Sequence, residues 1–233
     1  MRRLGRRQGF GLSADMLALD NGSLVNRVFE QLEEGILSGS IPPGESLIEL
    51  KLSRELGVSR TPVREAMRML EQKSLVRIVP NKGAVVLGVD VKDLLDVYTI
   101  RSYIEGLASR WVAERVTEDN RKELREIVDL QEFYNMKAYK DQVSEMDSRF
   151  HESIFSFCGS RTLEHLLKDF HHMIRRYRRH SLTGEGRAEK AIAEHRLILD
   201  AICDGDGDRA ERLTTEHIQN AKDNLLKLLG VSE

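Results

Sequence analysis

Between residues 52 and 86 the spacing of apolar positions changes from that of a helix to that of a short hairpin. A first helix ends at Leu56, ahead of a turn at Gly57-Val58. A second helix is expected to begin between Ser59 and Thr61, whose hydroxyls are available as caps. Its apolar residues share one face at helical spacing, namely Val63, Ala66, Met67 and Leu70. The pattern predicts a helix-turn-helix.

The stretch that follows has the pattern of two short strands. Apolar residues at 75–79 and at 83–86 flank a turn that contains Pro80, Lys82 and Gly83. Proline and glycine at the two ends of this turn favour a hairpin. Gly83 is also small enough to approach a sugar–phosphate backbone. We therefore predict a wing behind the helix-turn-helix.

A basic stripe follows the exposed side of the second helix. Arg60, Arg64 and Arg68 recur every four residues beside the apolar face. A helix with one buried face and arginines near its exposed N-terminal end suits the major groove of DNA. The alternative is a surface helix with solvated charges, which explains the arginine spacing but not the turn, helix start and wing in this order. The stretch predicts DNA binding.

Beyond a short linker at residues 88–90 the chain keeps a helical repeat to its end. We predict six helices, near 91–116, 119–136, 138–158, 161–181, 187–204 and 206–229. No strand pattern interrupts them. The predicted fold class is mainly α: a winged helix-turn-helix with a small β-hairpin, then an all-α bundle that is large enough for its own core.

The composition agrees with two domains of different charge. The chain has 233 residues, of which 40% are hydrophobic and 32% charged. Its net charge of −2 combines a net +2 in residues 1–90 with a net −4 in residues 91–233. Positive charge therefore concentrates where DNA is expected to bind. Residues 1–21 contain four arginines and several glycines, and we expect a flexible arm there.

The cysteine count and the hydropathy of the chain bear on where in the cell the protein is located. Two cysteines in a chain of this size argue for a reducing environment without a disulfide scaffold. No apolar run approaches the length of a membrane span, and the arginine-rich start lacks a signal-peptide core. We therefore predict a cytoplasmic protein without a membrane segment.

Ionisable residues fall on the apolar faces of three predicted helices. Asp147 and His151 lie one turn apart on the third, His195 lies on the fifth and His217 on the sixth. Three imidazoles and a carboxylate aimed at a core match the ligands of a divalent transition-metal ion. Each histidine alone could be a hydrogen-bonded core residue, and Asp147 with His151 a structural pair. The convergence from three helices favours a metal.

Two further features concern the surroundings of that cluster. Arg101 lies on the apolar stripe of the first bundle helix, and a buried guanidinium needs an anion, either Glu105 one turn on or a bound ligand. On the fourth bundle helix we expect His165 and His172 to point away from the core. The inward face is expected to consist of Leu163, Leu166, Leu167, Phe170 and Ile174.

Residues 41–45 and 57–66 resemble the N-terminal domain of the GntR family of bacterial transcription regulators. The resemblance covers about residues 22–88 and implies a winged helix that binds an operator as a dimer, ahead of a separate effector-binding domain. The fatty-acid-responsive branch has an arginine where this chain has Leu50, so Arg54, one turn on, is expected to contact a phosphate instead. The other implied DNA contacts are Arg60, Thr61, Arg64, Lys82 and Gly83.

The motifs at 147–151, 193–198 and 205–217 resemble the FCD ligand-binding domain of the FadR subfamily. The resemblance spans residues 91–230. It implies Arg101 and Asn220 as contacts of a small carboxylate effector. It also implies a metal, zinc in the first place and nickel or manganese as alternatives, held by Asp147, His151, His195 and His217.

The expected function is that of a DNA-binding transcriptional regulator, a repressor, and not an enzyme. We expect a homodimer on a pseudo-palindromic double-stranded operator, controlled by the carboxylate at the metal. Two alternatives stay open at this point. One is a metal-dependent hydrolase fused to a DNA-binding module, and the other is a regulator with a purely structural dimerisation bundle.

Overall fold

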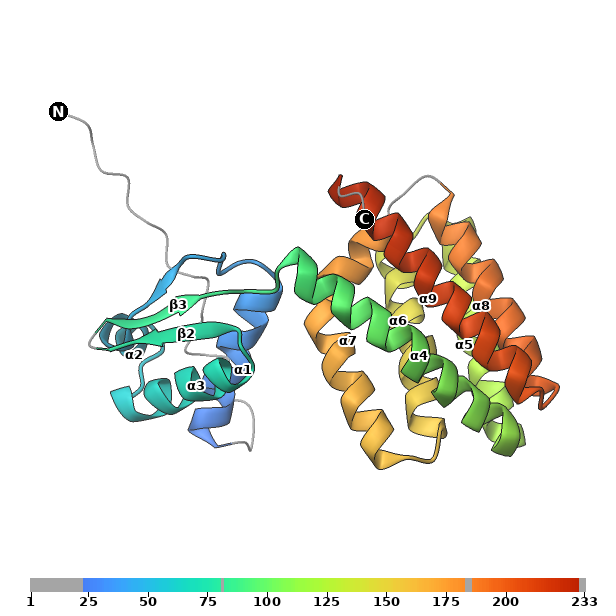
Figure 1. The fold of residues 1–233 in the computed structure, drawn as a ribbon, viewed down its shortest axis with the longest axis horizontal. Helices are drawn as coiled ribbons and strands as arrows, with labels where there is room; N and C mark the ends of the chain where they lie inside the picture. Colours follow the sequence, from blue (N-terminus) through green and yellow to red (C-terminus); the bar gives the residue numbers. More distant parts are fainter. Residues whose placement is uncertain (1–22, 81, 183–185, 231–233) are drawn as a thin grey trace. The chain divides into compact units, whose positions relative to one another are not determined.

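The computed structural model describes residues 23–80, 82–182 and 186–230 (Figure 1). The chain divides into two compact units, Met1–Asp90 and Val91–Glu233. The predicted N-terminal arm lies outside the described residues. Each unit has a hydrophobic core, and the described residues are mainly helical, which confirms the predicted fold class.

The N-terminal unit is a winged helix-turn-helix. Helix α3 buries one face against α1, and the four apolar residues predicted for that face are all buried. Helix α1 contributes Val28, Leu32 and Ile36 to the same core. The elements, in chain order, are α1 (Leu24–Leu37), β1 (Ser46–Leu47), α2 (Glu49–Glu55), α3 (Arg60–Gln72), β2 (Val76–Val79) and β3 (Gly83–Val86).

The start of α3 was predicted correctly, but the predicted cap was wrong. The helix begins at Arg60 after an extended residue, Ser59, whose hydroxyl makes no capping hydrogen bond. Thr61 lies inside the helix rather than at its cap. The N-terminal N–H groups of α3 are therefore left without a side-chain cap from Ser59.

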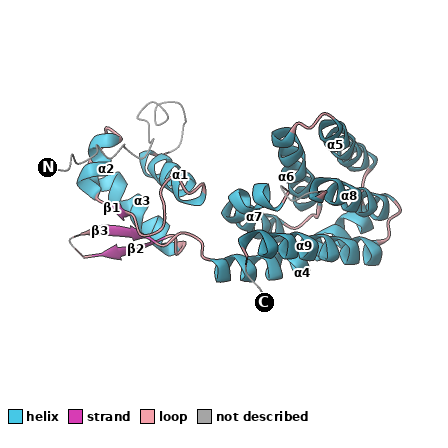
Figure 2. Ribbon diagram, turned by 90° about the horizontal axis from the view of Figure 1, so that it is seen from above, coloured by secondary structure: helices cyan, strands magenta, loops and turns pink. Residues whose placement is uncertain are grey.

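The described strands of the wing form an antiparallel sheet in the order β1-β3-β2 (Figure 2). Strands β2 and β3 are the predicted hairpin, with Val79 opposite Gly83. Strand β1 was not predicted because its two residues are too few to show an alternating pattern. It pairs Ser46 with Val85 and Leu47 with Ala84, and so fixes the chain ahead of α2 to the wing.

The helices predicted for the C-terminal unit are all present, with ends shifted by at most two residues (Figure 1). Thr117 and Asn120 form a capping box at the start of α5, and Asp206 caps α9. The described helices are α4 (Val91–Arg115), α5 (Glu118–Met136), α6 (Lys140–Phe157), α7 (Arg161–Ser181), α8 (Arg187–Cys203) and α9 (Gly207–Leu229).

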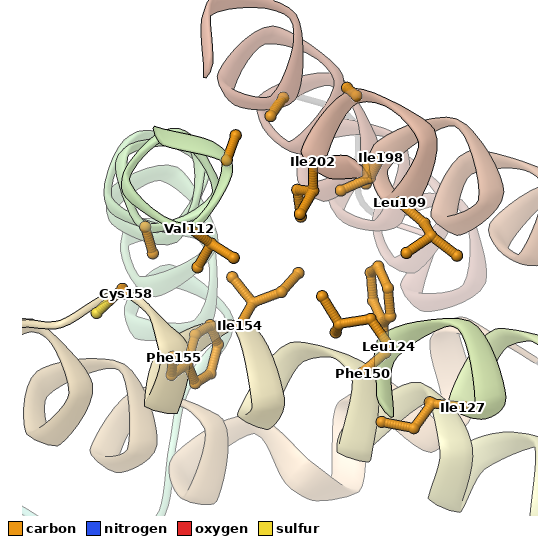
Figure 3. Packing of buried hydrophobic residues seen from close by; sticks show 14 of the residues in the cluster. Val112, Leu124, Ile127, Phe150, Ile154, Phe155, Cys158, Ile198, Leu199 and Ile202 are labelled. Carbon is orange, nitrogen blue, oxygen red and sulfur yellow. The ribbon is translucent and has the colours of Figure 1, made fainter. Parts of the chain in front are cut away.

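The core of this unit lies between α4, α5, α6 and α8 (Figure 3). Phe150 on α6 is fully buried among aliphatic side chains such as Val112, Leu124 and Ile202. Helices α4 and α9 lie side by side, and Gly106 permits their close approach. A Cβ atom at Gly106 would lie 2.6 Å from Oγ1 of Thr215, so a larger residue does not fit between these helices.

Candidate functional site

Three buried histidines from different helices meet inside the described part of the C-terminal unit. They are His151 on α6, His195 on α8 and His217 on α9. Nε2 of His217 lies 3.3 Å from Nε2 of His151 and 3.3 Å from Nε2 of His195. The same three nitrogens therefore face one point.

The other ring nitrogen of each histidine is held by an oxygen. Carboxylate and amide oxygens accept hydrogen bonds, so this network assigns the proton of each neutral ring to Nδ1 and leaves the lone pair of Nε2 facing the centre. The pairs of Nδ1 and oxygen are His151 with Glu105 (2.8 Å), His195 with Gln131 (2.8 Å) and His217 with Glu194 (2.6 Å).

This donor set fits a divalent transition-metal ion. Lone pairs that face one another repel, and a cation between them removes the repulsion. Two nitrogens that bind one ion at about 2.1 Å, at tetrahedral or octahedral angles, lie about 3.0–3.4 Å apart. The 3.3 Å separations fall within that range. Histidine ligands of metals also commonly donate from their second nitrogen to a carboxylate or carbonyl oxygen.

Asp147 lies beside the three histidines. Its side chain is buried, and Oδ1 is 3.7 Å from Nε2 of His195. The structure thus brings the four side chains named from the sequence to one place, with the carboxylate at a longer distance than the imidazoles.

Glu194 orients His217. Burial raises the pKa of Glu194, but hydrogen bonds from His217 and Arg187, together with the charge of Arg187, outweigh this effect and lower the pKa below its usual value. Arg187 binds both carboxylate oxygens, at 3.0 and 2.9 Å. Asn220, which stays a predicted effector contact, donates to Oε1 of Glu194 at 3.0 Å. Sequence reasoning missed Glu194, although it directly precedes His195.

The inward face of α7 differs from the prediction. His171 is 5% exposed, whereas Leu166, predicted to point inward, is 42% exposed. Among the α7 residues whose burial the structure describes, the buried ones are Leu163, Leu167, His171 and Ile174, a spacing of four, four and three residues that is itself helical. This helical spacing in the sequence could have identified His171 as a buried residue. His165 is exposed, as predicted.

Arg101 pairs with Glu105 and also has a donor to spare. Its Nε donates to Oε1 of Glu105 at 2.5 Å, and its Nη2 lies 3.3 Å from Nε2 of His171. Its Nη1 is buried and has no hydrogen-bond partner among the described residues. Arg101 lines a small cavity together with His151 and His217. The internal pair with Glu105 therefore exists, and contact of Arg101 with an effector stays a prediction.

A groove of about 450 Å³ runs along the N-terminal unit between α3, the start of α2 and the β2–β3 turn. Its lining includes four of the six residues expected to contact DNA, which are Arg60, Arg64, Lys82 and Gly83. Arg54 and Thr61 are exposed to solvent but are not among the described residues that line this groove. Glu49, which sequence reasoning missed, lies in the groove and forms ion pairs with both Arg60 and Arg64 at 2.9 Å.

Gly83 has a structural constraint of its own. Its φ is +95°, and a Cβ atom there would lie 2.1 Å from the carbonyl oxygen of Leu47. A glycine at this position is therefore required by the packing of β1 on the wing, whether or not it also touches DNA.

None of the described helices has an apolar stretch that is long enough to cross a membrane.

Comparison with known proteins assigns both units. The model of the gntR family of bacterial regulatory proteins matches residues 24–86, and that of the FCD domain matches residues 96–220. The HTH-type transcriptional regulator YdhC of Bacillus subtilis (strain 168) is 28% identical over 202 residues, covering 86% of this chain and 90% of YdhC.

Two proteins of Escherichia coli are also similar. The HTH-type transcriptional repressor RspR of strain K12 is 26% identical over 202 residues, covering 87% of this chain and 89% of RspR. The solved structure of McbR/YncC has a TM-score of 0.70 at 23% identity, covering 89% of this chain and 99% of that one. The latter likeness shows a shared fold.

Proposed function

Because this chain belongs to the GntR family of bacterial regulatory proteins and has an FCD domain, it is a transcriptional regulator and not an enzyme, and we propose that it is a repressor controlled by a small carboxylate at its histidine centre. The hydrolase alternative is set aside by this membership. The name of the similar repressor RspR supports the direction of control.

On the DNA side, the shared groove supports the proposal. Arg60 and Arg64 lie on the exposed side of α3, and Lys82 lies on the wing that flanks the same groove. We propose that α3 enters the major groove, that both arginines read base edges and that Lys82 contacts a phosphate. Arg54 and Thr61, which do not line the groove, remain proposed DNA contacts. Gly83 remains a proposed DNA contact on the wing.

We further propose a homodimer. A two-fold axis places two α3 helices one helical turn apart on a pseudo-palindromic operator. Helix α4 exposes Ile100 (44%) and Tyr103 (71%), apolar side chains that suit a contact between two copies of the C-terminal unit. A regulator of this kind acts where the DNA is, in the cytoplasm.

The single observation that carries the effector proposal is the convergence of three Nε2 atoms, each on a ring whose Nδ1 is held by an oxygen. His151, His195 and His217, with Asp147 beside them, would hold zinc, or alternatively nickel or manganese. The bound ion supplies a Lewis-acidic point for a carboxylate oxygen. Nη1 of Arg101 is the donor for such a carboxylate from the protein side.

Elemental analysis and mass spectrometry of protein purified without chelator test this proposal together. We expect about one metal ion per chain, and His195→Ala and His217→Ala lower that content strongly. His165→Ala is the matched control because His165 is exposed on α7. Wild-type metal content in both core variants would overturn the metal site. It would leave the purely structural bundle as the better account.

Calorimetry separates the role of Arg101 from that of the metal. Arg101→Ala is expected to keep the ion and to lose most of the affinity for the metabolite identified by mass spectrometry, because the fork that meets the carboxylate is gone. A variant that binds this metabolite as the wild type does would remove Arg101 from the site.

A further inference from the structure

One carboxylate joins two arginines of α3. Glu49 is the first residue of α2, and its Oε2 accepts from Nη2 of Arg60 and from Nη2 of Arg64, both at 2.9 Å. Its Oε1 accepts from Nε of Arg64 at 3.0 Å. The side chain of Glu49 is 20% exposed, whereas those of Arg60 and Arg64 are 58% and 49% exposed. The carboxylate is therefore covered, and the guanidinium groups face outward.

Glu49 occupies one edge of the Arg64 guanidinium and leaves a second edge available for a base. Glu49 binds the side edge of the guanidinium, formed by Nε and Nη2. The end edge, formed by Nη1 and Nη2, keeps two parallel N–H groups. A guanine offers O6 and N7 to such a pair of donors. Arg64 can therefore keep both bonds to Glu49 while it contacts a guanine.

The contacts of Glu49 with Arg60 and Arg64 also weaken non-specific DNA binding, which depends on the attraction between basic side chains and phosphates. Glu49 places a negative charge beside two arginines at the groove, which weakens the attraction of phosphates for both. It also removes side-chain freedom from the arginines before DNA arrives, so less entropy is lost when they meet bases. The first effect lowers non-specific affinity, and the second preserves specific affinity.

We propose that Glu49 is a positioning residue that raises the ratio of specific to non-specific DNA binding by holding Arg60 and Arg64. This inference rests on the proposed role of α3 as the recognition helix. It assigns to Glu49 no contact with a base.

The carboxylate is charged at neutral pH. The hydrogen bond from Arg64 is the largest influence, and with the bond from Arg60 and the charges of both arginines it outweighs burial and lowers the pKa of Glu49 to about 2. The ion pairs are thus formed under the conditions in which DNA binds.

The test compares Glu49→Gln with Glu65→Gln in the full chain. Glu65 on α3 pairs with Arg68 at 2.9 Å, so its variant removes the same charge from the N-terminal unit without breaking an ion pair of Arg60 or Arg64. The probes are a duplex selected by the wild-type chain from random-sequence DNA and a scrambled duplex of equal length. Both affinities are measured by fluorescence anisotropy over a series of salt concentrations.

For Glu49→Gln we expect the ratio of specific to non-specific affinity to fall about tenfold, as two side chains lose their order. Binding to the scrambled duplex is expected to strengthen, with a salt slope steeper by about 1. Glu65→Gln is expected to keep the wild-type ratio. An unchanged or higher ratio in Glu49→Gln, or an equal fall in both variants, would overturn the proposal.

A double-mutant cycle with Arg64→Ala separates this inference from the function on which it rests. If Glu49 acts through Arg64, the effect of Glu49→Gln on specific affinity shrinks in the Arg64→Ala background. Wild-type binding by Arg64→Ala would overturn the recognition-helix proposal itself. A loss in Arg64→Ala with no change in Glu49→Gln would overturn only the role of Glu49.

Discussion

His217 donates from Nδ1 to Oε2 of Glu194 over 2.6 Å, and this pair fixes which ring nitrogen faces the histidine centre. Glu194 is itself held by Arg187, which binds both of its oxygens, and by Asn220. The chain of contacts therefore extends from an arginine at the start of α8 to the Nε2 atom that is aimed at the proposed ion. Such partners keep a ligand in one tautomer and one orientation.

Replacing Glu194 by glutamine is expected to weaken metal binding about 10–100-fold, because an amide is a poorer acceptor for the imidazole N–H and leaves Arg187 without its anion. Competition with a chromophoric chelator measures the affinity for zinc. Glu189→Gln is the matched control, since Glu189 lies exposed on the same helix. Equal affinity in both variants would show that Glu194 does not support the site.

Much of the bundle was predictable because a helix repeats its contacts every three or four residues. That repeat located the helix ends to within two residues and placed His151, His195 and His217 on inward faces. It could not identify the oxygens that hold them. Gln131 and His195 are 64 residues apart, and only the packing of α5 against α8 brings them together.

The errors have local physical causes. Strand β1 exists through its pairing with β3 and has no pattern of its own in two residues. His171 was missed because a face drawn through Leu166 and Phe170 lies beside the buried one. Glu49 precedes Arg60 by eleven residues across a turn, and its role follows from the way α2 meets α3 rather than from spacing.

Gly83→Ala is expected to destabilise the wing by more than the ordinary cost of a left-handed alanine, which is about 1–2 kcal/mol. A Cβ at this position would lie 2.1 Å from a backbone oxygen of β1 that cannot move alone. Gly44→Ala is the matched control, since Gly44 has φ +82° but no atom within 4 Å of the added Cβ. Thermal denaturation followed by circular dichroism compares them. A similar loss of stability in both variants would mean that the sheet shifts readily to accommodate the added Cβ.

Gly106→Ala is expected to lower the stability of the C-terminal unit, although alanine normally favours a helix interior by about 1 kcal/mol over glycine. The added Cβ would lie 2.6 Å from Oγ1 of Thr215 and 3.1 Å from the backbone oxygen of Glu211. Oγ1 of Thr215 also donates to backbone oxygens, so it cannot turn away freely. Urea denaturation measures the change, and a stabilised variant would contradict the close packing of α4 on α9.

The pH dependence of stability gives a test of the Glu49 ion pairs without DNA. In the folded chain the pKa of Glu49 is about 2, below its ordinary value of 4.5. The contribution of the pairs is therefore fully present above about pH 4.5 and is lost as the pH falls toward 2. Glu49→Gln lacks this contribution at every pH, so its stability deficit relative to the wild type should shrink over that range.

The measured quantity is the difference in melting temperature between the wild type and Glu49→Gln at a series of pH values between 2 and 7. Taking the difference cancels the titration of groups that both chains share, including the histidine centre. Glu65→Gln is again the control, because Glu65 pairs with Arg68 rather than with Arg60 and Arg64. A deficit that stays constant from pH 6 to pH 2 would mean that Glu49 stabilises the unit through packing. The ion pairs with Glu49 would then not be what holds the side chains of Arg60 and Arg64 in place.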